Sequence, residues 1–326
     1  MLTSSLPTQF LVTGCAGFIG SHLCERLLAD GHSVTGIDAL TDFYDSQLKR
    51  QNLAPLLASK RFSFIFRELL DTEESLLQDA EVIFHLAARP GVRTSWGREF
   101  ETYVRYNILS TQYLLDCASR SRTLKRIVFA SSSSIYGDSP TEHAKEDQPK
   151  NPISPYGVTK LAAEHLCWAY AAQSGIPVVA LRLFTVYGPR QRPDMAFHRL
   201  IHAALTRTKF VLYGDGDQRR DFTHVQDVVG AFLLAAKSSQ PSQAFNIAGG
   251  GIVNMNEAVT LVEDLTGVSI EVERVKPQSG DVRQTGADLS RSRDILGYEP
   301  RVSLREGLKA QVNDVERTLR NAAVSS

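Results

Sequence analysis

Short apolar runs that alternate with helix-like segments constrain the fold of this sequence more than any other feature. The runs are rich in β-branched and aromatic residues and lie at 9–14, 33–38, 61–66, 80–87, 126–131 and 177–183. Segments between them, such as 18–29 and 107–119, carry apolar residues at three- and four-residue spacing, which predicts amphipathic helices. Nearly continuous apolar strands are typical of a parallel sheet that helices cover on both faces. The sequence therefore predicts an α/β fold built on a doubly wound parallel sheet.

The alternation weakens after about residue 184, where loops bearing glycine and proline mix with further predicted helices and short strands. We expect residues 1–183 to form a Rossmann-like domain and residues 184–326 to form a smaller, mixed α/β lobe over the strand ends. A helix-then-strand pattern returns later in the chain, so we expect a segment at about 221–250 to rejoin the first domain.

The charge and composition of the chain argue against several classes of partner. The 36 basic residues balance 36 acidic ones, so no broad surface for nucleic acid or for a membrane is expected. The first residues lack the pattern of a leader, no apolar run is long enough to span a membrane, and the four cysteines form no CxxC pair. His198 and His202 have no third candidate metal ligand nearby in the sequence. We therefore expect a cytoplasmic protein with reduced thiols and no metal site.

A glycine motif, VTGCAGFIGSH at 12–22, directly follows the first apolar run. Gly14, Gly17 and Gly20 let the backbone turn sharply and approach a pyrophosphate, whose charge then lies at a helix N-terminus. Asp38 ends the second run, at the distance from these glycines where a carboxylate hydrogen-bonds the adenosine ribose diol. A carboxylate there would repel a 2′-phosphate and no arginine follows it directly, so the pattern favours NAD over NADP. A tight strand-to-helix turn without a ligand is the alternative.

A tyrosine and a lysine at YxxxK spacing, Tyr156 and Lys160, follow a helix N-cap signal at Ser154 and Pro155. One helical turn would bring the Lys160 ammonium near the Tyr156 phenol. Tyrosine is a poor base at neutral pH because its unperturbed pKa is about 10, and a nearby cation or an oxidised nicotinamide would favour the phenolate. Such a phenolate can take a hydroxyl proton while hydride leaves the same carbon. The same spacing on an ordinary surface helix is the alternative interpretation.

Three serines, Ser132, Ser133 and Ser134, directly follow the fifth apolar run at the predicted end of its strand. In a parallel sheet this strand end would lie near the tyrosine and lysine, where hydroxyls can hydrogen-bond a substrate hydroxyl or carbonyl. A polar loop without a ligand is the alternative.

Together these motifs resemble the extended short-chain dehydrogenases/reductases that act on nucleotide sugars. The resemblance runs from about residue 9 to about 312, and its further motifs are HLAA at 85–88, Asn107 and GDGDQRRDFTHVQDV at 214–228. It implies that residues 1–183 bind NAD and that residues 184–326 bind a nucleotide sugar. It also implies a homodimer formed through a four-helix bundle by the helices at 107–119 and 156–172.

The resemblance implies a role for each matched residue. Tyr156 would be the catalytic base, Lys160 its partner and a ligand of the nicotinamide ribose, and Ser132 the residue that orients the sugar 4-hydroxyl. Glu68 and Leu69 would lie by the adenine, where the family has aspartate followed by a hydrophobic residue, so Glu68 is a departure. The implied cofactor site comprises Gly14, Gly17, Phe18, Ile19, Gly20, Asp38, Glu68, Leu69, Leu86, Ala87, Ala88, Asn107, Tyr156 and Lys160.

Within the family, the chain most resembles UDP-glucuronate 4-epimerases, in PGVRTSWG at 90–97 and TVYGPRQRPDMAF at 185–197. Dehydratases carry Asp-Glu where this chain has Ser133 and Ser134, and UDP-glucuronate decarboxylases carry glutamate at the position of Ser134. The resemblance thus implies oxidation at C4, rotation of the 4-keto sugar and re-reduction on its other face. A UDP-glucose or UDP-N-acetylhexosamine 4-epimerase is the alternative, followed by a UDP-glucuronate decarboxylase and a non-catalytic NAD sensor.

The implied substrate site includes donors for a sugar carboxylate and arginines for a diphosphate, which a guanidinium grips through two parallel bonds. Two prolines, Pro189 and Pro193, would hold Arg192 on a stiff loop. A solvated loop in which Arg192 pairs with Asp194 is the alternative. The expected substrate residues are Arg93, Ser132, Ser133, Ser134, Thr185, Arg192, Met195, Arg220 and Arg283.

Overall fold

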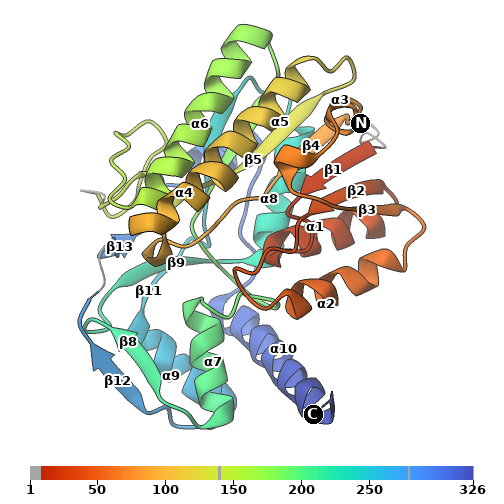
Figure 1. Ribbon diagram of the computed structural model, residues 1–326. Helices are drawn as coiled ribbons and strands as arrows, with labels where there is room; N and C mark the ends of the chain where they lie inside the picture. The colour runs from red at the N-terminus through yellow and green to blue at the C-terminus, as the bar shows by residue number, and fades with distance from the viewer. Residues whose placement is uncertain (1–8, 139–140, 278–279, 326) are drawn as a thin grey trace.

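The computed structural model describes residues 9–138, 141–277 and 280–325. Residues 1–8, on which the expectation about a leader largely depends, therefore lie outside the described residues. Figure 1 shows a larger body, in which helices flank a central sheet, above a smaller lobe that holds the C-terminal helix.

A parallel sheet of seven strands forms the centre of the larger body, which confirms the predicted doubly wound fold. All neighbouring strands are parallel, in the order β10-β6-β5-β4-β1-β2-β3. The six predicted strands lie close to their expected bounds. The strands are β1 (Gln9–Thr13), β2 (Ser33–Asp38), β3 (Phe62–Phe66), β4 (Val82–His85), β5 (Arg126–Ser132), β6 (Val178–Leu183) and β10 (Gln243–Ile247).

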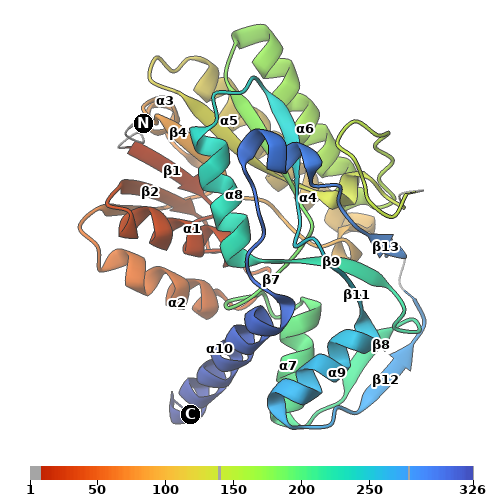
Figure 2. The ribbon, with the colours of Figure 1, turned by 180° about the vertical axis from the view of Figure 1, so that it is seen from behind.

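Helices cover both faces of this sheet because successive strand residues point to opposite sides. Phe10 and Val12 pack into one hydrophobic cluster with α1 (Phe18–Ala29), α2 (Ser46–Leu57) and α8 (Val225–Lys237). Leu11 packs into a second cluster with α3 (Glu74–Gln78), α5 (Ser110–Ser119) and α6 (Pro155–Ser174). Figure 2 shows the first group of helices from behind the sheet.

The helix expected at 107–119 is part of a longer helical segment with an irregular centre. It begins with α4 (Phe100–Tyr103), passes through a π-helical turn, η4 (Val104–Leu109), and continues as α5. A single π-helical turn inside a helix often marks a functional site. Apolar spacing predicted the regular part but not this turn. Shorter turns elsewhere are η1 (Leu69–Asp71), η2 (Arg93–Ser95), η3 (Gly97–Glu99), η5 (Ser133–Ile135) and η6 (Ser292–Leu296).

The chain rejoins the larger body after its first excursion into the lobe. Helix α8 packs beside α1, and β10 pairs with β6 along its whole length, from Gln243 opposite Val179 to Ile247 opposite Leu183. Residues 221–224 do not join the large sheet. They belong to β9 (Arg219–His224), which pairs with β7, β11 and β13 in a smaller sheet.

The smaller lobe has its own hydrophobic core, in which Tyr187, Phe197 and Leu308 are fully buried. Its sheets contain β7 (Thr185–Tyr187), β8 (Phe210–Tyr213), β9, β11 (Ile252–Asn254), β12 (Val272–Val275) and β13 (Gln284–Thr285). Its helices are α7 (Ala196–Thr206), α9 (Met255–Thr266) and α10 (Leu304–Ser325). Among the described residues, no helix has both the length and the apolar character needed to cross a membrane. All four cysteines are free, buried thiols.

A buried ion pair fixes α6 against the sheet. Arg182 of β6 donates to Glu164 of α6, and the two side chains are 4% and 2% exposed. The Ser131 hydroxyl also donates to Glu164, at 2.7 Å, and Arg182 donates to the Tyr136 hydroxyl at 2.8 Å. Because these charges are paired and hydrogen-bonded, removing one would leave the other buried without compensation.

We expect Glu164→Gln to lower the free energy of unfolding by about 3 kcal/mol or more, since it leaves Arg182 without its counter-charge. The measurement is urea unfolding followed by circular dichroism. Asp30→Asn is the matched control, because its pair with Arg26 is exposed and should be worth less than about 1 kcal/mol. Equal losses in the two variants would contradict the assignment.

Candidate active site

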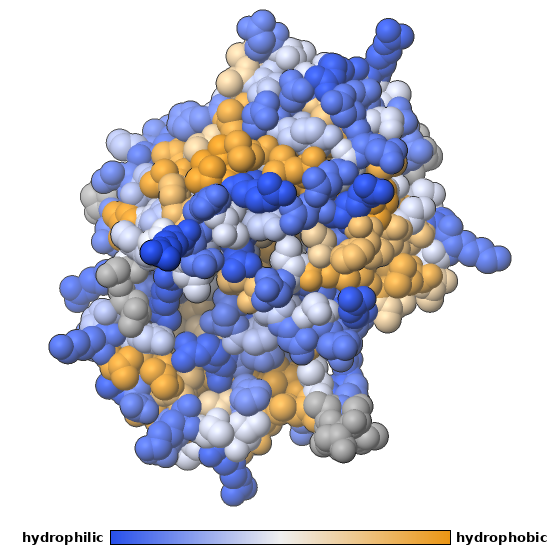
Figure 3. Space-filling model, in the orientation of Figure 1, coloured by the Kyte–Doolittle hydropathy of each residue, from blue (hydrophilic) through white to orange (hydrophobic). Residues whose placement is uncertain are grey.

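A cavity of about 900 Å³ lies where the carboxyl ends of the parallel strands face the smaller lobe. Figure 3 shows this face of the molecule hollowed between the two bodies. Asp38, Ser132 and Leu183 contribute from the strand ends, while Phe210 and Met255 contribute from the lobe. The predicted site residues that line it are Gly14, Gly17, Phe18, Ile19, Gly20, Asp38, Glu68, Leu69, Leu86, Ala87, Ala88, Arg93, Ser132, Ser133, Ser134, Tyr156, Lys160, Thr185, Arg192, Met195 and Arg220.

The glycine turn brings the N-terminus of α1 to the cavity wall. Gly14 has a φ of +74°, and a Cβ atom there would lie 2.9 Å from the Ala87 nitrogen. A Cβ atom at Gly20 would lie 2.1 Å from the Gly14 carbonyl oxygen, so neither position has room for a side chain. The N-cap, Gly17, provides no side-chain acceptor for the first amides of α1. These amides are therefore available to an anion.

Asp38 fixes the loop next to the glycine turn. One carboxylate oxygen accepts from the Leu40 amide at 2.8 Å and the other from the Ala16 amide at 3.0 Å. Burial raises the pKa of Asp38, while Lys49 and the two amides oppose the rise. A carboxylate has about four lone-pair sites, so this one can still accept from two hydroxyl groups.

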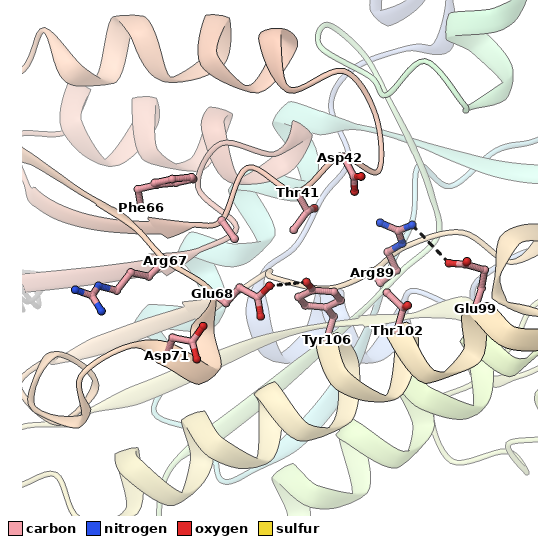
Figure 4. A pocket seen from close by; sticks show the side chains of 11 residues that line it. Thr41, Asp42, Phe66, Arg67, Glu68, Asp71, Arg89, Glu99, Thr102 and Tyr106 are labelled. Atoms are coloured by element: carbon pink, nitrogen blue, oxygen red, sulfur yellow. Dashed lines mark hydrogen bonds and ion pairs between the residues drawn. The ribbon is translucent and has the colours of Figure 1, made fainter.

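Glu68 reaches from the end of β3 to the π-helical turn, as Figure 4 shows. Its carboxylate accepts from the Tyr106 hydroxyl at 2.7 Å and from Arg105 at 2.7 Å. The hydrogen bond from Tyr106 is the main cause that lowers the pKa of Glu68. The family pattern has an aspartate here, and an aspartate side chain is shorter than that of Glu68. The glutamate reaches Arg105 and Tyr106 and thereby connects this end of the cavity to the segment at 100–119. Arg89 faces the same space and lies 3.9 Å from Glu99.

Two predicted site residues, Asn107 and Arg283, do not line the cavity. Asn107 is buried behind its wall, where the side chain accepts from the Arg89 amide at 2.7 Å and donates to Thr159 at 3.0 Å. Arg283 is exposed, and its carbonyl oxygen accepts from Arg220 at 3.3 Å. Each thus lies next to the wall and contacts a residue that does line it.

Tyr156 and Lys160 lie on the first turns of α6, as the N-cap signal predicted. Ser154 caps the helix by accepting from the Gly157 amide at 3.1 Å, and Pro155 occupies the first turn. Lys160 donates to the Ala130 carbonyl at 2.9 Å, and burial lowers its pKa to about 8. The lysine is thereby tied to β5, the strand that ends in the serines.

Burial raises the pKa of Tyr156, and two neighbours oppose that rise. The larger opposing effect is a hydrogen bond with Ser132, and the other is the positive charge of Arg192. The sequence predicted that the Lys160 ammonium and an oxidised nicotinamide would favour the phenolate; in this structure the Lys160 ammonium donates to the Ala130 carbonyl. The structure therefore electrostatically links the tyrosine to the loop at 188–195.

Arg192 lines the cavity, as expected for a residue of the substrate site, and it also pairs with Asp194, as expected in the alternative interpretation. Its guanidinium donates twice to the carboxylate, at 3.0 and 2.9 Å, and lies 5.6 Å from the centre of the Phe43 ring. Thr185, also in the wall, begins β7, a strand that the sequence analysis did not predict. This strand pairs with β9, from Thr185 opposite Phe222 to Tyr187 opposite His224.

Sequence reasoning missed several residues of the cavity wall. Phe43 lies under Arg89, with 4.5 Å between the guanidinium and the ring centre, and the buried Nε of Arg89 has no hydrogen-bond partner among the described residues. Lys49 is buried and donates to the Thr41 carbonyl at 2.8 Å. These cations and the aromatic ring lie on separate segments, Lys49 on α2 and Phe43 and Arg89 on loops, and form no local motif, so no signal in the sequence could have grouped them.

Comparison with known proteins gives one family match and relatives along nearly the whole chain. Residues 10–248 match the NAD dependent epimerase/dehydratase family. An uncharacterized UDP-glucose epimerase of Bacillus subtilis is 46% identical over 93% of this chain and 96% of its own. A UDP-glucuronate 4-epimerase of Thermodesulfobacterium geofontis is 36% identical over 93% and 95%. The crystal structure of a UDP-glucuronic acid 4-epimerase from Bacillus cereus with UDP-glucuronic acid and NAD superposes with a TM-score of 0.92, at 42% identity, over 95% of this chain and 99% of that one.

We expect Gly20→Ala to reduce the NAD content of the purified protein severely, since its Cβ atom would collide with the Gly14 carbonyl and displace the turn. The measurement is release of nucleotide by heat, followed by chromatography. Gly230→Ala, inside α8 with open space around the site, is the control and should keep NAD at the wild-type level. Full occupancy in Gly20→Ala would show that the turn does not hold the cofactor.

Proposed function

Because the chain belongs to the NAD dependent epimerase/dehydratase family, we propose that it is a 4-epimerase that interconverts UDP-glucuronate and UDP-galacturonate. The observation that carries the proposal is the meeting of Ser132, Tyr156, Lys160 and Arg192 in one cavity. This set combines a proton acceptor, its supporting groups and a cation for a sugar carboxylate. The Bacillus cereus relative binds UDP-glucuronic acid and NAD in its crystal structure, which supports the same substrate and cofactor here.

The cofactor site fits NAD on the geometry of the glycine turn. The uncapped amides of α1 would hold the diphosphate, and Asp38 would accept hydrogen bonds from the adenosine ribose. We assign Leu69 and the segment 86–88 to the same site, with Glu68 beside the adenine and Asn107 acting through the Arg89 backbone. When bound, NAD accepts the hydride from C4 of the sugar and later returns it.

The protein's own groups would manage the proton. Tyr156 as phenolate takes the proton of the 4-hydroxyl as the hydride leaves C4, so the carbon becomes a ketone. Ser132 holds the oxygen atom, and Lys160 keeps a positive charge beside the site. After the 4-keto sugar has rotated within the site, the hydride returns to the opposite face of C4 and Tyr156 returns the proton. Oxidation and reduction cancel, so the reaction needs no external oxidant or reductant.

Sugar recognition in this proposal depends on charge. Arg192, with hydroxyl donors from Ser133, Ser134 and Thr185, would bind the carboxylate of glucuronate. Arg93 and Arg220 would contact the diphosphate, with Arg283 supporting Arg220, and Met195 would contact the sugar from the start of α7. Arg93 pairs with Asp281 at 2.7 Å, so it would exchange this partner for the substrate.

A UDP-glucose or UDP-N-acetylhexosamine 4-epimerase is the second candidate. The Bacillus subtilis relative, 46% identical, carries the name of a UDP-glucose epimerase, which favours this alternative. A neutral sugar needs no cation at its C6 position. Dependence of turnover on Arg192 therefore separates the two candidates.

The proposal also covers the roles of the two domains, the oligomeric state and the cellular location. We propose that residues 1–183, with the return segment at about 221–250, bind NAD and that residues 184–326 form the nucleotide-sugar lobe. We also propose a homodimer through the segment of η4 and α5 and through α6, because Leu109 of η4 and Val158 of α6 are 48% and 45% exposed and Figure 3 shows apolar side chains gathered over this part of the surface. The free state of the four cysteines supports a reducing compartment, the cytoplasm, as the location.

The deciding experiment is incubation of the purified protein with UDP-glucuronate and no added cofactor, followed by NMR. UDP-galacturonate should appear, because NAD that is retained and regenerated in each turnover suffices. Tyr156→Phe, which keeps the ring but not the proton acceptor, should slow turnover by about 100-fold or more. Formation of UDP-xylose, or no reaction of UDP-glucuronate in the wild type, would refute the proposal.

A second prediction concerns loss of CO2. Oxidation at C4 of glucuronate gives a β-keto acid, which decarboxylates when the bond to the carboxylate stands perpendicular to the carbonyl plane. We propose that Ser133 and Thr185 help hold the carboxylate away from that orientation. Ser133→Ala and Thr185→Val should then release more UDP-4-keto-pentose per UDP-galacturonate, measured by mass spectrometry, whereas Thr185→Ser should resemble the wild type. An unchanged ratio in both variants would refute this role.

A further inference from the structure

The loop at 188–195 carries two arginines that face in different directions. Arg192 lines the cavity, whereas Arg190 reaches into the larger body. The φ of Arg190 is +64°, a left-handed conformation that is uncommon for residues other than glycine and asparagine. Such a conformation persists where surrounding contacts determine it. The contacts of Arg190 therefore explain how the loop obtains its shape.

Arg190 binds helix α1 through its side chain and α10 through its backbone. The guanidinium contacts the Glu25 carboxylate at 2.6 Å and the Ser21 hydroxyl at 3.2 Å. Its amide donates to Asp314 of α10 at 2.7 Å. The carbonyl of the preceding residue, Pro189, accepts from His22 of α1 at 3.0 Å. Two helices that are remote in sequence thus fix this point of the loop.

Further hydrogen bonds hold the residues on either side of Pro189 and Arg190 in the loop. Gln311 of α10 accepts from the Gly188 amide at 3.0 Å and donates to Gln191 at 2.8 Å. Gln191 in turn accepts from the His198 amide at the start of α7, at 2.9 Å. Gln191 and Gln311 are buried, so these bonds are shielded from water. Among the residues that the structure describes, the pair of Arg190 with Glu25 is the one ion pair that joins this loop to α1.

The direction of Arg192 follows from this attachment. One residue separates the two arginines, and Pro193 restricts the backbone that follows. Arg190, held on α1, and Gln191, which donates to the Val186 carbonyl and accepts from Gln311, fix the backbone from which Arg192 reaches the cavity. There its charge opposes the rise that burial causes in the pKa of Tyr156. Helix α1 also provides the amides of the glycine turn at its N-terminus. One helix therefore connects the expected cofactor site with the expected carboxylate site.

We propose that Arg190 is a positioning residue for substrate selectivity: its pair with Glu25 sets the place of Arg192 and thereby favours sugars that carry a carboxylate over neutral ones. The inference rests on the proposed function, because it names what determines the preference for glucuronate. Arg190 itself does not contact the substrate in this scheme. Its loss should raise KM for UDP-glucuronate and change kcat much less.

The test compares Arg190→Gln with the wild type for UDP-glucuronate and for UDP-glucose, by steady-state kinetics and by calorimetric binding. Because a small misplacement of a positioning group can be costly, we expect kcat/KM for UDP-glucuronate to fall by about 10-fold or more. The value for UDP-glucose and the NAD content should stay near those of the wild type. Glu25→Gln should behave in the same way.

Two further variants separate positioning from a general structural role. The charge exchange Arg190→Glu with Glu25→Arg should recover most of the lost affinity for UDP-glucuronate, because it restores the pair with reversed partners. Arg26→Gln, a neighbour on α1 whose pair with Asp30 is exposed, should have no effect on selectivity. Recovery by the exchange and a selective loss in the single variants would support the inference.

Other outcomes would overturn the inference, and they are distinguishable from failure of the proposed function. Equal losses for both sugars, or loss of NAD from Arg190→Gln, would show that the pair only maintains the fold. Unchanged selectivity in a wild-type enzyme that does epimerise UDP-glucuronate would refute the inference alone. A wild type that neither binds nor converts UDP-glucuronate would refute the proposed function and, with it, this role of Arg190.

Discussion

The close approach of α1 to the end of β1 is the constraint on which the rest of this site depends. The backbone carbonyl of Gly14 occupies the space that a side chain at Gly20 would need, so α1 can lie this close to the end of β1 only because residue 20 is glycine. That position directs the uncapped amides of α1 toward the cavity. It also places Ser21 and Glu25, further along the helix, where they meet Arg190. The glycine turn of the cofactor site therefore also determines where the loop at 188–195 attaches to the larger body.

Burial and charge have opposite effects at the centre of the cavity. Desolvation raises the pKa of Tyr156 and lowers that of Lys160, so the neutral form of each group is favoured by its surroundings. Hydrogen bonding with Ser132 and the charge of Arg192 act on Tyr156 in the other direction. A carboxylate bound at Arg192 would partly cancel that charge. Under the proposed function, substrate binding would therefore be electrostatically coupled to the proton affinity of the tyrosine.

Local patterns in the sequence predicted much of this architecture. Apolar runs gave the parallel strands, the glycine spacing gave the turn, and Ser154 with Pro155 gave the start of α6, because each depends on residues close together in the chain. The π-helical turn and strand β7 were not predicted, since the first interrupts a regular spacing and the second is short. Asn107 and Arg283 were matched to a family pattern, yet their side chains do not line the cavity. The backbone path around them decides where they point, and spacing carries no information about it.

The sequence by itself determined the succession of the six predicted parallel strands along the chain, the position of the glycine turn and the placement of Tyr156 and Lys160 on the first turns of one helix. Those features follow from steric limits and periodicities that act over a few residues. Only the tertiary structure decided which arginine of the loop at 188–195 faces the cavity. That choice depends on Glu25 and Asp314, which lie far from the loop in the chain and reach it only after α1 and α10 have packed. Contacts between remote segments are energetic properties of the folded chain, so a short motif cannot specify them.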